Sequence, residues 1–199
     1  MSEQSVDIYR ELVGINRDAH LPALASALGN HASVLARVER ATDAVPFSQR
    51  SVDLFGDLAD RNRDTYLHSA AISLQNHGQI LTQADRAADA APFSQRSVDL
   101  FRELADRNRD LFPDYAQSVM TLGWVLAECD RDAEAITYMV KGFMLCQLLP
   151  EHAQGLLDAA KDLLRIAYAQ EPAAVAREFR AETGGDVPSW IAEPPAPPE

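Results

Sequence analysis

The sequence has few cysteines and lacks any long apolar run. Cys129 and Cys146 are the only cysteines in 199 residues, too few for a disulfide framework. Both lie in apolar, helix-like surroundings, so we expect buried, reduced thiols. No run of apolar residues is long enough to span a membrane. The first residues show no basic region followed by an apolar run, as a signal peptide would. These absences predict a soluble, cytoplasmic protein.

Signatures of catalysis and of metal binding are also missing. The chain has no glycine-rich phosphate loop, no HExxH and no nucleophile elbow. Paired carboxylates such as Asp57 and Asp60 lie on a polar helical face beside arginines, which is typical of a solvated surface. His31 and His77 fall on an apolar stripe, and no Cys, Asp or Glu completes a metal-binding set at ligand spacing. The sequence therefore predicts no enzyme, no cofactor and no metal.

Negative charge is in excess over the whole chain. The net charge is −12 and the isoelectric point is about 4.8. An acidic surface repels phosphate backbones and anionic lipid, so nucleic acid and membranes are poor candidate partners. Solubility is the simplest explanation of the acidity.

What the sequence does contain is an internal repeat. Residues 46–55, PFSQRSVDLF, recur unchanged as residues 92–101, and a weaker echo lies at residues 5–9. A fixed period of 46 residues indicates stacked repeats.

Helical patterns fill each repeat. Leu24, Leu28 and Leu35 follow helical spacing, and strand-like alternation is almost absent. We expect a first helix at residues 20–37, 65–83 and 112–128, and a second helix at 41–61, 87–107 and 132–149. Further helices are expected at residues 3–15, 151–169 and 172–182. The predicted fold is an all-α solenoid of antiparallel helix pairs, with eight or nine helices.

Two kinds of break separate these helices. The triplet Asn-Arg-Asp occurs at residues 16–18, 62–64 and 108–110. Its asparagine suits a left-handed residue after a helix end, and its aspartate suits the cap of the next helix. The other break is a polar cluster, as at residues 37–40.

Pro46 and Pro92 lie early in the second helices. If Asp43 and Asp89 cap those helices, the prolines fall in the first turn, where they are tolerated. A start one turn earlier would instead predict a kink at each proline. We prefer the capped start.

The motif letters resemble tetratricopeptide repeats of the long-period kind found in actinobacterial proteins, similar to those of kinesin light chains. The family's Leu-Gly pair, large residue and alanine are matched by Leu122-Gly123, Leu126 and Ala135, by His77-Gly78, Leu81 and Ala90, and less well by His31-Ala32, Leu35 and Ala44. The resemblance implies a right-handed superhelix whose first helices line a concave surface for a peptide or protein. It places the duplicated stretch on the back helix, away from that surface.

The same resemblance divides the chain into parts. Residues 1–183 would form the helical domain, with repeats at about 5–50, 51–96 and 97–141 and capping helices at 142–183. Residues 184–199, which include four prolines between Pro194 and Pro198, would form a flexible tail.

The resemblance also implies candidate groove residues on the first helices. They are Asn30, Ser33, Arg37, Gln75, Asn76, Gln79, Gln83, Thr121 and Trp124. Asn30 and Asn76 match an asparagine whose amide can pair with a bound backbone. Thr121 interrupts that series, and Trp124 is either an exposed anchor or a buried side chain. An ordinary solvated helix face is the alternative for the whole set. Because this face lacks lysine, a clamp for a carboxylate terminus is not supported.

The expected helix at residues 3–15 has no first helix before it. Its apolar side, with Val6, Tyr9, Leu12 and Val13, either forms a homodimer at the N-terminal edge or caps the next helix. We favour the cap.

The sequence thus predicts a non-catalytic interaction or scaffold module for a protein or peptide partner. The alternative is a regulatory or sensory component of a signalling ATPase or transcription-regulator system.

Overall fold

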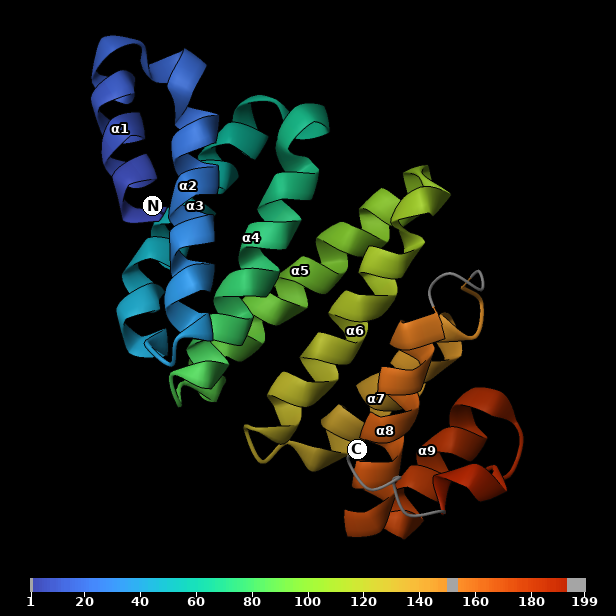
Figure 1. Ribbon diagram of the computed structural model, residues 1–199. Coiled ribbons are helices and arrows are strands. Elements are labelled where there is room, and N and C mark those ends of the chain that lie inside the picture. The colour runs from blue at the N-terminus through green and yellow to red at the C-terminus, as the bar shows by residue number, and fades with distance from the viewer. Residues whose placement is uncertain (1, 150–153, 193–199) are drawn as a thin grey trace. The chain divides into compact units, whose positions relative to one another are not determined.

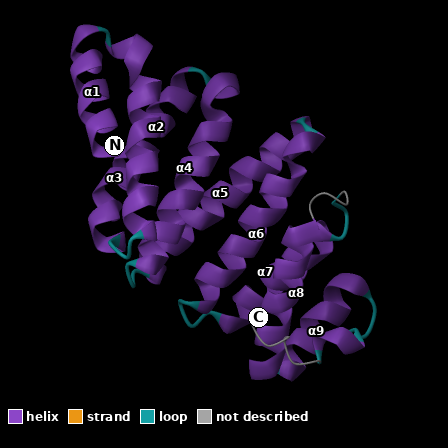
Figure 2. Cartoon of the chain, in the orientation of Figure 1, coloured by secondary structure: helices purple, strands orange, loops and turns teal. Residues whose placement is uncertain are grey.

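A computed structural model describes residues 2–149 and 154–192, and every regular element in these ranges is a helix (Figure 2). The all-α prediction is therefore confirmed. The chain divides into two compact units, residues 1–104 and 105–199, which are described separately below.

Unit 1 is a row of antiparallel helices. It contains α1 (Ser2–Ile15), α2 (Arg17–Arg37), α3 (Ala41–Arg61), α4 (Arg63–Gln83) and most of α5 (Ala87–Arg107). Each of α1, α2 and α3 packs on the helix that follows it, and α4 also contacts α2 (Figure 1). Connections of one to three residues join these helices.

The asparagine of the Asn-Arg-Asp triplet caps the helix that follows it. Asn62 has a non-helical backbone, with φ −146° and ψ 84°, and its side-chain oxygen accepts the backbone N–H of Thr65 at 3.3 Å. Asn16 does the same for Ala19 at 3.3 Å. The sequence prediction of a left-handed asparagine and a capping aspartate is wrong, because the asparagine itself satisfies the orphan N–H group.

Left-handed residues occur instead at the other type of break. Glu39, Asp85 and Asp130 have φ of 61°, 57° and 57°. The N–H after each one reaches back to the carbonyl five residues earlier, as from Arg40 to Leu35 at 3.0 Å. This is a Schellman turn built with an acidic residue where glycine is usual.

The Schellman turn also decides where the second helices start. The carbonyl of Arg40 already accepts the N–H of Ala44 at 3.1 Å, so α3 begins at Ala41. Pro46 therefore lies inside the helix, and Asp43 pairs with the Arg40 guanidinium at 2.8 Å rather than capping. The predicted capped start is wrong here.

Helix α5 repeats the early start of α3. It begins at Ala87, with Pro92 inside the helix and Asp89 bonded to Arg86.

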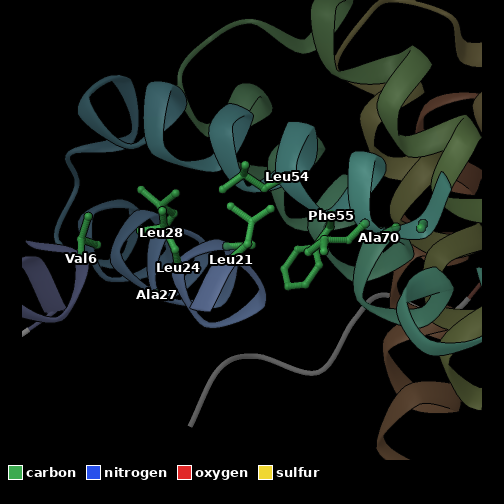
Figure 3. Close-up of a cluster of buried hydrophobic side chains, with 11 residues drawn as sticks. Val6, Leu21, Leu24, Ala27, Leu28, Leu54, Phe55 and Ala70 are labelled. Carbon is green, nitrogen blue, oxygen red and sulfur yellow. The ribbon is translucent and has the colours of Figure 1, made fainter. Parts of the chain in front are cut away.

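An apolar cluster joins the first four helices (Figure 3). Val6 of α1, Leu21 and Leu28 of α2, and Leu54 and Phe55 of α3 are all buried in it. Burying one such side chain contributes about 1.5–3 kcal/mol.

Helix α1 takes part in this cluster through Val6, which is 1% exposed, and Tyr9 and Val13 pack beside it. Of the four side chains that suggested a dimer contact, Val6 is buried and Tyr9, Leu12 and Val13 are half-buried, and both the dimer and the cap stay predictions.

Buried serines tie the second helix to the first in each repeat of unit 1. Ser51 donates a hydrogen bond to the carbonyl oxygen of Ala25 at 2.9 Å. Ser97, 46 residues later, donates to that of Ala71 at 3.0 Å. The sequence period is therefore also a period of contacts.

Unit 2 is also built from helices that pack on one another. It contains the end of α5, η1 (Arg109–Leu111), α6 (Phe112–Ala127), α7 (Asp132–Cys146), α8 (Gln154–Gln170), α9 (Pro172–Thr183) and η3 (Ser189–Ile191). Helix α7 packs against α6, α8 and α9. Cys146 is buried on α7 and Cys129 is half-buried, and both are free thiols.

The segment predicted as a tail contains a regular element in its first part. Residues 189–191 form a short 3-10 helix in which Ile191 is buried. The Trp190 ring lies 5.2 Å from that of Phe143. The backbone carbonyl of Trp190 accepts a hydrogen bond from the Arg165 side chain. The proline run lies outside the described residues.

Candidate binding groove

A pocket of about 170 Å³ opens between α2 and α4, with α3 as its floor. Its lining residues are Ser26, Gly29 and Asn30 of α2, Ser48, Ser51 and Phe55 of α3, and Ser69, Ile72, Ser73 and Asn76 of α4. We call this pocket the groove. It lies entirely within unit 1.

Helical spacing explains why these side chains share one surface. Ser26, Gly29 and Asn30 lie three and four residues apart on α2, so they form one stripe. On α4, Ser69 and Ser73 precede Asn76 by seven and three residues and form the facing stripe. Most of these side chains are small, which leaves room between the two helices.

Two asparagines supply the free hydrogen-bonding groups of the groove. Asn30 is exposed and Asn76 is half-buried. Neither amide makes a hydrogen bond to another residue in the described ranges 2–149 and 154–192. Each amide keeps two donors and an acceptor for a ligand.

Three of the serine hydroxyls, in contrast, donate within the fold. Ser26 donates to the carbonyl of Pro22 at 3.1 Å, and Ser73 donates to that of Ala70 at 2.8 Å. Ser51 donates to Ala25, as described above. Their protons are committed, so these hydroxyls offer a ligand acceptor lone pairs.

A histidine supports the floor. The Nδ1 atom of His77 lies 2.8 Å from Ser48 Oγ, and its ring meets the Phe93 ring edge-on at 4.6 Å. Burial, together with a smaller effect of the nearby Arg86, lowers the pKa of His77 to about 4. His77 is therefore neutral at neutral pH, and none of the ten lining residues carries a charge.

Ser48 and His77 have the residue types of a nucleophile and its base, but not the properties. Their side chains are 2% and 1% exposed, which leaves no room for a substrate. A histidine with a pKa of about 4 is a weak base at neutral pH. The pair is a structural contact between consecutive repeats.

The structure brings together some of the predicted groove residues. Asn30 and Asn76 line the groove, whereas Ser33, Arg37, Gln75, Gln79 and Gln83 do not. Ser33 is half-buried and donates to the carbonyl of Gly29 at 3.0 Å.

The other two predicted residues belong to unit 2. Thr121 is 9% exposed and donates to the carbonyl of Gln117 at 3.0 Å. Trp124 is half-buried, between the two alternatives that the sequence left open.

The sequence analysis missed much of the groove. Ser69, Ile72 and Ser73 could have been found by stepping back from Asn76 at helical spacing. Ser48 and Ser51 belong to the duplicated stretch that was placed on the back helix, yet they form part of the floor. The inward side of α3 therefore contributes to the groove, whichever face of the chain binds a partner.

The described residues also form other hollows, some larger than the groove. Another hollow in unit 1, of about 570 Å³, lies where α3 and α5 begin and includes Pro46 and Pro92. Within residues 2–149 and 154–192, no group of three or more His, Cys, Asp or Glu side chains is arranged to hold a metal ion. No helix among them is both long enough and apolar enough to cross a membrane.

Comparison with known proteins yields a structural likeness only. No protein-family model matches the chain, and no curated protein matches it in sequence. Among solved structures, the chain is similar to the crystal structure of BtubC (BKLC) from P. vanneervenii, with a TM-score of 0.49 and 14% sequence identity. That match covers 100% of this chain and 94% of the other. A likeness at this level assigns the chain neither a family nor a function.

Proposed function

We propose that this protein is a non-catalytic interaction module that holds an extended segment of another protein in the groove. The observation that carries the proposal is the pair of unpartnered amides, Asn30 and Asn76, facing one uncharged pocket. They lie 46 residues apart, at equivalent places in consecutive repeats.

An extended chain is the ligand that suits such amides. Its backbone N–H and C=O groups have no internal partners, so they need both donors and acceptors. An asparagine amide supplies both, and the serine hydroxyls beside it add acceptors. The helical scaffold is already formed, so binding costs little ordering of the protein.

Selection from a random peptide library on the immobilised full-length protein tests this function. The test variant is Asn30→Ala with Asn76→Ala, and the control is Gln4→Ala with Gln170→Ala. Gln4 and Gln170 are exposed amides outside the groove. A hydrogen bond contributes about 1 kcal/mol, so losing two should weaken binding of the selected peptides roughly 30-fold.

The control variant should bind the peptides as the wild type does, and all three proteins should have equal helix content by circular dichroism. The proposal fails if the wild type selects no peptide, or if the asparagine variant binds as tightly as the control.

A further inference from the structure

We infer that the segment held in the groove is uncharged where it enters and inserts one aliphatic side chain, of valine to leucine size, between α2 and α4. This inference rests on the proposed function and specifies the chemistry of its ligand.

The first reason is electrostatic. The chain carries a net charge of −12, yet all ten lining residues of the groove are uncharged. A charged side chain entering the groove would lose water and find no ion partner, which is strongly unfavourable. An uncharged segment avoids that cost.

The second reason is an exposed apolar side chain at the right place. Ile72 is 40% exposed, although large apolar residues on this chain are mostly buried. It lines the groove together with Phe55 of the floor, and Gly29 of the opposite wall has no side chain. An apolar group inserted here would cover Ile72 from water.

The third reason is size. The groove has a volume of about 170 Å³. Cavities of roughly 150 Å³ accommodate a group as large as benzene, so one branched aliphatic side chain fits in the groove.

Gly29 limits the depth of the groove. A Cβ atom at Gly29 would lie 3.1 Å from Ser51 Oγ, so α2 and α3 are already in close contact there. The groove cannot deepen at that point without separating the two helices.

Synthetic peptides derived from the library selection provide the test. Each position of one selected peptide is replaced in turn by Leu, Ala, Trp, Glu and Lys, and the Kd is measured by fluorescence anisotropy. We expect one position where a peptide with Leu binds at least about tenfold tighter than the same peptide with Glu or Lys. The Kd of the parent peptide should change less than about twofold between low and high salt.

Two matched variants test whether the inserted aliphatic side chain, the anchor, contacts Ile72. Ile72→Asp brings a carboxylate into the groove and should weaken binding of the parent peptide at least about tenfold. Ile8→Asp makes the same change at an isoleucine of α1 that is 55% exposed, and it should leave binding unchanged. Because both sites are exposed, both variants should fold.

The outcomes separate the two levels of the proposal. If Asn30→Ala with Asn76→Ala weakens binding but no position prefers an aliphatic residue, or Ile72→Asp binds normally, the aliphatic anchor is refuted and the groove function stands. If the wild type selects no peptide, or binding ignores the asparagines, both are refuted.

Discussion

Acidification from pH 7.5 to 5 should destabilise unit 1 through one side chain, His77. Its imidazole is 1% exposed between Ser48 and Phe93, and burial holds its pKa at about 4. In the unfolded chain the pKa of a histidine is about 6.5. The folded state therefore resists protonation that the unfolded state accepts.

The sign and size of the effect follow from these two pKa values. Above pH 6.5 the imidazole is neutral in both states, and its contribution to stability is fully present. As the pH falls from 6.5 toward 4, the unfolded state gains a proton first, so stability is lost. The loss is about 2 kcal/mol at pH 5 and about 3 kcal/mol below pH 4.

Denaturation by guanidinium, followed by circular dichroism at several pH values, measures this loss. The comparison variant is His77→Leu, because Leu122 occupies the equivalent place before Gly123 in the next repeat. Ser48 keeps its hydrogen bond to the carbonyl of Val45 at 3.0 Å in that variant.

Between pH 7.5 and 5, the wild type should lose about 2 kcal/mol more unfolding free energy than His77→Leu. Equal pH dependence in the two proteins would refute the assignment, as would a His77 ring that titrates near pH 6.5 by NMR.

Two further substitutions test the ends of the helix rows. Val6→Asp places an unpaired carboxylate in the buried contact between α1 and α2, so it should lower the unfolding free energy by about 3 kcal/mol without changing the mass by light scattering. A wild-type dimer that Val6→Asp converts to an equally stable monomer would contradict the capping role of α1. Trp190→Ala removes the ring contacts with Phe143 and Arg165 and should destabilise unit 2 by about 2 kcal/mol in chemical denaturation. Unchanged stability would show that the segment at residues 189–191 does not hold the fold.

The helices and their period were predictable from the sequence because they depend on local spacing. The apolar stripe of Leu24 and Leu28 is visible within a few helical turns. The duplication of residues 46–55 is visible because the two copies are identical in sequence. Asn30 and Asn76 could be placed on one face for the same reason.

The turns were less predictable because competing local preferences exist for each residue. Asparagine suits both a left-handed residue and a cap, and Asn62 takes the second role. Asp85 takes the left-handed position, where the sequence offers no glycine. Only the geometry of the whole turn, with its backbone hydrogen bonds, decides between them.

The floor of the groove could not be predicted from one helix at a time. Ser48 and Phe55 line it because α3 lies beneath the gap between α2 and α4. That arrangement depends on tertiary packing, which cannot be predicted from the sequence pattern of α3 alone. The same holds for Trp190, whose place is set by contact with α7 and α8.

The most direct test of the groove is an NMR titration of the 15N-labelled protein with a selected peptide. The side-chain amide signals of Asn30 and Asn76 should shift together, along with backbone signals at residues 26–30 and 69–76. Shifts concentrated instead at the hollow beside Pro46 and Pro92, or in unit 2, with both amide signals unchanged, would contradict the account.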